Sequence, residues 1–182
     1  MSSTQEEILK LGESLICTKG YTGFSYKDIS VPLGIKNAAI HYHFPSKADL
    51  GIEVIRLNQE RFQELKETVQ DNSPAEKIDA LVNLYRSNHE KGYLCITAAL
   101  SPSFESLPDE MKEELTSYTN DLRQWLTNAL LEGKELGQFG FEGDIRSMAD
   151  QMLGSFISSL VLERVTSEPI LDKVISELLG SE

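Results

Sequence analysis

Apolar residues recur every three or four positions along most of the chain, which is the spacing that places them on one face of an α-helix. Two short series are Ile8, Leu11 and Leu15, and Ile78, Leu81 and Tyr85. The longest series consists of Met111, Leu115, Tyr118, Leu122, Trp125 and Ala129. No segment shows the convincing alternation of a half-buried strand. The pattern therefore predicts an all-α protein.

Serine–acid pairs three residues apart mark the predicted helix starts, because a hydroxyl and a carboxylate at this spacing can satisfy the free amide groups of a first turn. The pairs are Ser25–Asp28, Ser46–Asp49, Ser73–Glu76 and Ser106–Asp109. Gly92 and the glycine-rich segment 133–143 interrupt the helical pattern. We expect short connections between the helices.

The two predicted C-terminal helices, residues 145–165 and 169–179, carry apolar residues in adjacent pairs. These stripes are wider than a single core contact requires. Because burial against both the chain's own core and a second subunit explains the width, we predict a homodimer with a four-helix interface. The alternative is a fully internal helix pair in a monomer. The predicted interface residues are Phe156, Leu160, Ile170, Val174 and Leu178.

The sharpest local pattern lies between residues 25 and 44. Ile29 and Leu33 lie one turn apart before Gly34, which can supply the positive φ of a tight turn between two helices. Ile40 and Phe44 then form the inner face of a second helix. This is the spacing of a helix-turn-helix. Its outward face offers groups that can meet phosphates and base edges, namely Lys36, Asn37, His41 and Tyr42.

Residues 4–55 resemble the N-terminal region of the TetR family of transcriptional regulators. The matching segments are, in order, Ile8-Leu9, Leu15-Ile16, Lys19-Gly20-Tyr21, Ser25, Asp28-Ile29, Leu33-Gly34-Ile35, Ile40-His41-Tyr42-His43-Phe44 and Ser46-Lys47-Ala48-Asp49-Leu50. His41 stands where the family most often has a phosphate-contacting tyrosine, and Ala38-Ala39 replace a common Gly-Thr. Several positions agree at once, so a chance match is improbable.

The resemblance implies an N-terminal helix-turn-helix DNA-binding domain, residues 1–46, and a C-terminal helical bundle for effector binding and dimerisation, residues 47–182. It also implies a homodimer that binds a palindromic double-stranded DNA operator. The positions at which family members contact DNA are Ser25, Tyr26, Lys36, Asn37, His41, Tyr42 and Lys47.

Charge is distributed unevenly over the 182 residues, which carry a formal net charge of −12. Residues 1–50 hold five lysines and five acidic residues, so the whole acidic excess lies in the rest of the chain. Since DNA attracts cations, any DNA-binding face belongs to this neutral N-terminal third. No apolar run approaches the roughly 20 residues of a membrane span, and no secretory signal pattern begins the chain. We expect a cytoplasmic protein without membrane contact.

Other chemistry has weaker support in the sequence. His41 and His43 are two residues apart and point in different directions on a helix, so they cannot hold a metal ion together. The glycines of segment 133–143 lack the preceding strand of a phosphate-binding loop. We expect no catalytic residues, no metal and no cofactor.

A small apolar or aromatic effector is the expected ligand of the C-terminal helices. The candidate contacts are Tyr85, His89, Phe104, Trp125 and Met152, although aromatic residues and Met at this spacing also fit a helical core. Two hypotheses follow. The first is a ligand-responsive DNA-binding regulator, a repressor that a small molecule releases from its operator. The alternative is an all-α binding or enzymatic protein in which the helix-turn-helix serves only packing.

Overall fold

The computed structural model describes the backbone of residues 3–179 and the side chains of residues 3–177. Every regular element in this range is a helix, so the predicted all-α fold is confirmed. The elements are α1 (Ser3–Lys19), α2 (Lys27–Leu33), α3 (Asn37–His43), α4 (Lys47–Thr68), α5 (Pro74–Glu90), α6 (Ile96–Leu100), the 3-10 helix η1 (Ser101–Ser106), α7 (Asp109–Glu135), α8 (Ile145–Thr166) and α9 (Leu171–Leu179). Over the described residues, no helix is both long enough and apolar enough to span a membrane.

The chain forms two compact units. Unit 1 consists of Met1–Glu60 and Ile96–Tyr118, and unit 2 consists of Arg61–Cys95 and Thr119–Glu182. Both α4 and α7 contribute residues to each unit. The division into DNA-binding residues 1–46 and effector-binding residues 47–182 is one of function, and it stays a prediction.

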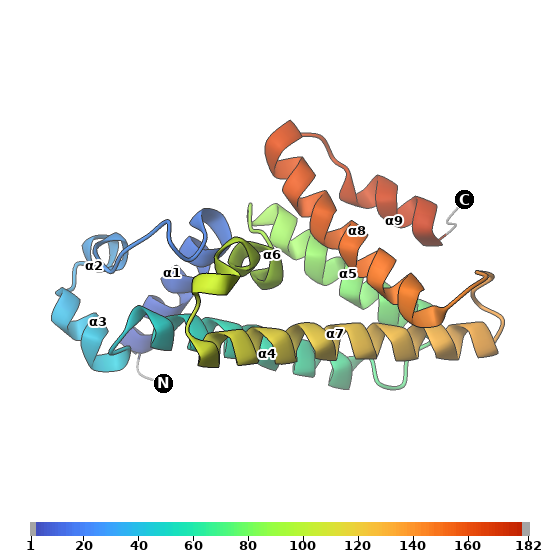
Figure 1. The fold of residues 1–182 in the computed structure, drawn as a ribbon, viewed down its shortest axis with the longest axis horizontal. Coiled ribbons are helices and arrows are strands. Elements are labelled where there is room, and N and C mark those ends of the chain that lie inside the picture. Colours follow the sequence, from blue (N-terminus) through green and yellow to red (C-terminus); the bar gives the residue numbers. More distant parts are fainter. Residues whose placement is uncertain (1–2, 180–182) are drawn as a thin grey trace. The chain divides into compact units, whose positions relative to one another are not determined.

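In unit 1, α1 packs against α2, α3 and α6, and α2 lies beside α3 (Figure 1). The largest fully buried side chains of this core include Ile8, Ile16, Ile29, Ile40 and Phe44. Gly12 allows a close approach of Leu50, because a Cβ atom at Gly12 would lie 3.0 Å from both Leu50 Cδ atoms. The first turns of α4 are thereby held against α1.

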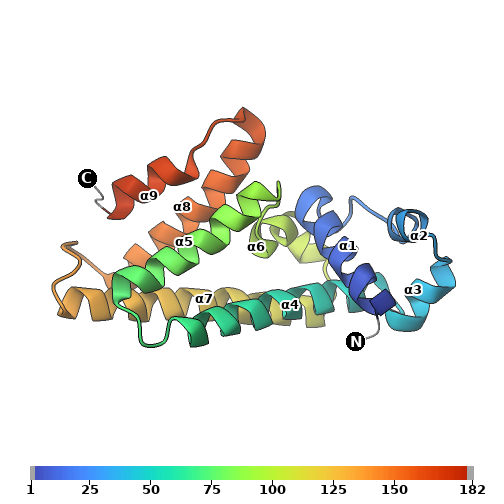
Figure 2. The same cartoon turned by 180° about the vertical axis from the view of Figure 1, so that it is seen from behind.

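In unit 2, α5 packs against α8, and α9 folds back along α8 (Figure 2). The Tyr85 ring of α5 meets the Phe156 ring of α8 at 5.4 Å between centroids, and both side chains are buried. Phe62 and Trp125 make an edge contact at 5.6 Å. Two aromatic pairs therefore lie between helices of this unit.

The predicted helix starts agree with the structure in most cases. Asp28 accepts hydrogen bonds from the backbone and hydroxyl of Ser25, and Ser46–Asp49 and Ser73–Glu76 form complete capping boxes. The Ser106 prediction is wrong, because this hydroxyl donates instead to the Ser103 carbonyl at 2.8 Å. The hydroxyl of Ser106 therefore closes η1 and does not cap α7, which begins at Asp109.

Candidate nucleic-acid interface

A left-handed glycine ends α2 and turns the chain into α3. Gly34 has φ 65°, and the Ile35 amide donates to the Ser30 carbonyl at 3.0 Å. Residues with a Cβ atom rarely adopt this backbone conformation, which explains the glycine at this position. The turn predicted from the sequence is therefore confirmed, with Pro32 accommodated inside the short α2.

Tyr26 joins the beginning of α2 to the end of α3. Its hydroxyl donates a buried hydrogen bond of 2.9 Å to the Phe44 carbonyl, and its ring meets the His41 ring at 4.8 Å. Burial, with smaller contributions from the charge of Asp49 and from Tyr21, raises the pKa of Tyr26 to about 12. The hydroxyl therefore remains a donor, and Tyr26 lies beneath α3 and not on its exposed face. As a direct DNA contact, Tyr26 stays a prediction.

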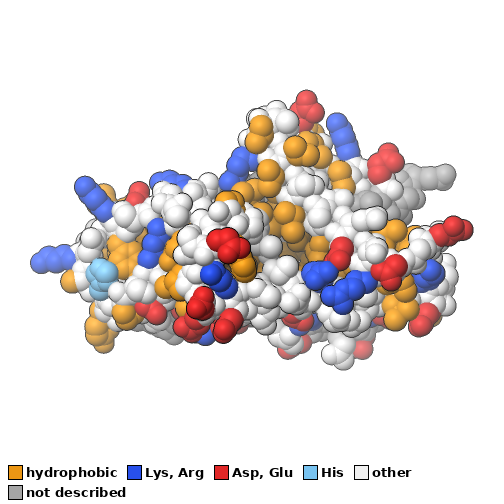
Figure 3. Space-filling model, in the orientation of Figure 1, with side chains coloured by type: hydrophobic (Ala, Val, Ile, Leu, Met, Phe, Trp, Pro, Cys, Tyr) orange, Lys and Arg blue, Asp and Glu red, His pale blue; other side chains and the backbone are white. Residues whose placement is uncertain are grey.

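The exposed face of α3 brings together four of the predicted DNA-binding residues. They are Lys36, Asn37, His41 and Tyr42, and Tyr42 is 83% exposed. Lysine and histidine side chains are visible at the surface over α2 and α3, at the left of Figure 3. A cation at the N-cap of α3, and an amide, an imidazole and a phenol from the seven-residue helix itself, are thus presented to solvent.

The His41 ring has a defined tautomer. Its Nδ1 lies 2.9 Å from the Pro45 carbonyl oxygen, which can only accept a hydrogen bond. Nδ1 therefore carries the hydrogen. In the neutral ring Nε2 is then a bare acceptor, and it can donate to another group only after the ring gains a proton.

Ser25 and Lys47 flank this region and have internal partners. The Asp28 carboxylate that binds Ser25 has its pKa lowered by these hydrogen bonds and by nearby Lys19. The Lys47 ammonium donates to the Phe24 carbonyl and lies 4.0 Å from the centroid of the Phe24 ring. Burial lowers the pKa of Lys47. Ser25 is exposed and Lys47 half-buried, and their DNA contacts stay predictions.

The five predicted effector contacts do not share one place. Phe104 belongs to unit 1, whereas the other four belong to unit 2. Tyr85 and Met152 are buried in the core, and Trp125 packs on Phe62. His89 lies at the end of α5, with its Nδ1 2.8 Å from Glu163 Oε2. As effector contacts, these residues stay predictions.

The predicted dimer residues divide into two groups. Phe156 and Leu160 are buried in the core of unit 2, while Ile170 and Val174 are half-buried on either side of the first turn of α9. The side chain of Leu178 lies outside the described residues. Three other apolar residues of α8 are exposed, Val161, Leu162 and Val165, and hydrophobic side chains are visible at the surface over α8 in Figure 3.

The sequence reasoning missed three residues that the structure makes relevant. Val31 of α2 is 67% exposed and Ala38 is exposed on α3, so both present methyl groups beside the polar ones. Glu163 is a buried acid in α8. Its position could have been noticed, because it continues the three- and four-residue spacing of the buried residues Met152, Phe156 and Leu160.

The fold and the exposed α3 define a helix-turn-helix protein of the kind that binds DNA. The family model described as "Bacterial regulatory proteins, tetR family" matches residues 8–54. A TetR-family regulator from Agrobacterium tumefaciens is 27% identical with a TM-score of 0.90, covering 98% of this chain and 96% of that one. A TetR regulator from Legionella pneumophila is also 27% identical, with a TM-score of 0.83, covering 99% of this chain and 95% of that one.

The chain is also similar to the HTH-type transcriptional repressor DhaR from Mycobacterium sp. (strain GP1). It is 22% identical over 158 residues, which cover 84% of this chain and 76% of the relative. In residues 8–54 and in its fold, the chain is therefore similar to TetR-family transcriptional regulators. These similarities are to DNA-binding transcriptional regulators.

Replacing Tyr26 with Phe removes the hydroxyl and leaves the buried Phe44 carbonyl without its donor. We expect the free energy of unfolding to fall by about 1–3 kcal/mol, the cost of an unsatisfied buried polar group. Urea denaturation measures the change. Tyr42→Phe is the matched control, since this hydroxyl is exposed, and it should leave stability unchanged. Equal losses in both variants would contradict the assigned role.

Proposed function

We propose that this protein is a TetR-family repressor that binds a palindromic operator as a homodimer and leaves it when a small molecule binds. The observation that carries the proposal is the exposed face of α3, where a cation, an amide, a histidine and a tyrosine lie together. A helix pair that served packing alone, as in the alternative hypothesis, would have no need of this face. The name of the repressor DhaR supports repression.

Different residues at the exposed face of α3 suit different parts of the DNA. Lys36, at the N-cap of α3, suits a phosphate oxygen, and Asn37, at the first helical position, suits the paired donor and acceptor of an adenine. The Ala38 methyl suits the methyl group of a thymine. Tyr26 lies beneath this face, and Ser25 and Lys47 flank it.

Dimerisation through α8 and α9 is the second part of the proposal. Gly154, Ser158, Val161 and Val165 follow one another at spacings of three or four, so they form one exposed stripe. A Cβ atom at Gly154 would meet no atom within 4 Å, which leaves room for another helix to approach. We therefore place the interface on this stripe and on the adjoining residues of α9, with Phe156 and Leu160 supporting it from the core.

Release by an effector requires that the ligand prefer one of two conformations. We propose that residues 47–182 hold a small apolar or aromatic molecule. The coupling element is α4, because it begins directly after the DNA-binding helices and supplies residues to both units. A gel shift on the DNA upstream of the chain's own gene tests operator binding, and a compound that abolishes the shift tests release.

Phosphate and base contacts are separable by mutation. Lys36→Ala should weaken binding to specific and random DNA alike and reduce the slope of log K against log salt by about 0.9 for each chain. Asn37→Ala should instead reduce discrimination at one base pair of each half-site by about 1–3 kcal/mol. Lys91→Ala, which changes an exposed lysine at the end of α5, is the control and should change neither quantity. Unchanged operator binding in the first two variants would show that the face is wrongly assigned.

The stripe on α8 predicts which apolar residues hold the dimer. Val165→Glu places a charge in a dry interface, where it has no partner. The variant should be monomeric by light scattering and bind the operator about a hundredfold or more weakly, because the two half-sites are no longer linked. Leu136→Glu is the control, since Leu136 is also apolar, is 62% exposed and does not belong to the stripe on α8. A dimeric Val165→Glu protein would disprove the assigned interface.

A further inference from the structure

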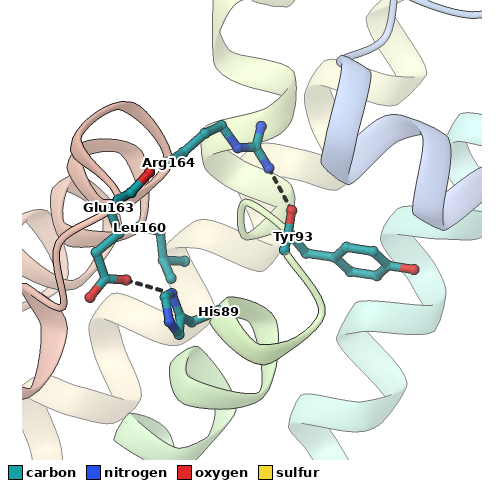
Figure 4. Close-up of a pocket in the computed structure, with 7 residues that line it drawn as sticks. His89, Tyr93, Leu160, Glu163 and Arg164 are labelled. Atoms are coloured by element: carbon teal, nitrogen blue, oxygen red, sulfur yellow. Dashed lines mark hydrogen bonds and ion pairs between the residues drawn. The ribbon is translucent and has the colours of Figure 1, made fainter.

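Unit 2 contains a cavity of about 280 Å³ at the end of α5 and the end of α8 (Figure 4). The cavity combines polar groups with the apolar wall of Leu160. Its volume is close to the lower end of the range for small-molecule sites. The residues that line it are His89, Gly92, Tyr93, Leu160, Glu163, Arg164 and Ser167.

Glu163 is the central polar group of this cavity, and only 4% of its side chain is exposed. One carboxylate oxygen, Oε1, accepts hydrogen bonds of 2.7 Å from the backbone amides of Ile170 and Leu171. These amides lie at the beginning of α9, where backbone donors lack helical partners. Oε1 thus holds the chain where α9 starts.

The second oxygen of Glu163 is not satisfied in this way. Oε2 lies 2.8 Å from His89 Nδ1, and the two side chains point toward each other in Figure 4. This contact is not aligned as a hydrogen bond, so the buried Oε2 has no hydrogen-bond donor among the described residues. A buried carboxylate oxygen in this condition is costly unless a donor reaches it.

The guanidinium group of Arg164 contacts a backbone carbonyl of the cavity lining. Arg164 Nη2 donates to the Gly92 carbonyl at 2.9 Å, so this carbonyl is also occupied (Figure 4). Glu163 Oε2 remains as an acceptor with an apolar wall beside it. A positively charged donor matches the buried Glu163 carboxylate, while the Arg164 guanidinium in the same lining opposes it.

We propose that this cavity binds a small protonated amine, whose ammonium group donates to Glu163 Oε2 and whose apolar body packs on Leu160. Because the other oxygen of the same carboxylate holds the start of α9, the ligand is linked to the position of that helix. The assignment rests on the proposed regulator only in naming its effector class. Its test contains no DNA, so its failure and the failure of operator binding are distinguishable.

The experiment is calorimetric titration of the full chain with phenethylammonium chloride, compared with 2-phenylethanol and 3-phenylpropionate. The ammonium compound should bind saturably and more tightly than the alcohol, and the carboxylate should not bind. Glu163→Gln should weaken ammonium binding about tenfold or more, because a charge-assisted hydrogen bond is lost. The glutamine oxygen can still accept from the Ile170 and Leu171 amides, so α9 keeps its partner.

Arg164→Gln is the matched variant with the opposite expected sign. Removing a positive charge beside the cavity should strengthen ammonium binding, an effect that loss of folding cannot imitate. Circular dichroism verifies the helix content of both variants. Absence of saturable binding, preference for 3-phenylpropionate, or equal ammonium affinity in wild type and a folded Glu163→Gln would each overturn the proposal. Should Glu163→Gln fail to fold, the three-ligand comparison and Arg164→Gln decide the question.

Discussion

The hydrogen bond from the Tyr26 hydroxyl to the Phe44 carbonyl fixes the geometry on which the DNA-binding face depends. It joins residues 18 positions apart, at the beginning of α2 and the end of α3, in a buried site. The Gly34 turn holds the other ends of these two helices together. With both ends tied, the short α3 has little freedom to rotate. Its outward residues therefore keep a common direction, which recognition of base edges requires.

The acidic residues near this face form local hydrogen bonds in the turns before α2 and α4. Asp28 and Asp49 lie near it, but each carboxylate accepts two hydrogen bonds from a serine, Ser25 and Ser46 respectively. Both carboxylates are therefore held by hydrogen bonds in the turns before α2 and α4. The excess of acidic residues lies beyond residue 50. Lys36 then remains exposed where a phosphate can reach it.

Local signals in the sequence predicted the helix-turn-helix correctly, because its glycine, its capping pairs and its apolar spacing act over a few residues. The exposed stripe on α8 was harder to predict from the sequence. An adjacent apolar pair such as Leu160 and Val161 shows only that one member is buried, and the choice depends on neighbours distant in sequence. In the structure Leu160 is buried and Val161 is 40% exposed.

The same limit applies to the cavity of unit 2. His89 and Glu163 are far apart along the chain and meet only when α5 packs on α8. The sequence shows that Glu163 lies at the spacing of the buried apolar residues of α8. It cannot show which carboxylate oxygen of Glu163 accepts a hydrogen bond. Ser106 gives a smaller example, because the preceding 3-10 helix uses its hydroxyl. Predictions from the sequence thus succeed where the partners are close along the chain.

The central claim is that two copies of the α3 face bind DNA together. Selection of binding sites from a random duplex library, followed by footprinting of the selected DNA, tests it most directly. We predict a palindrome whose half-site centres lie one helical turn apart, about 34 Å, or a multiple of this distance. Both half-sites should be protected on the same side of the duplex. Enrichment of no sequence, or of a single unrepeated site, would contradict the claim.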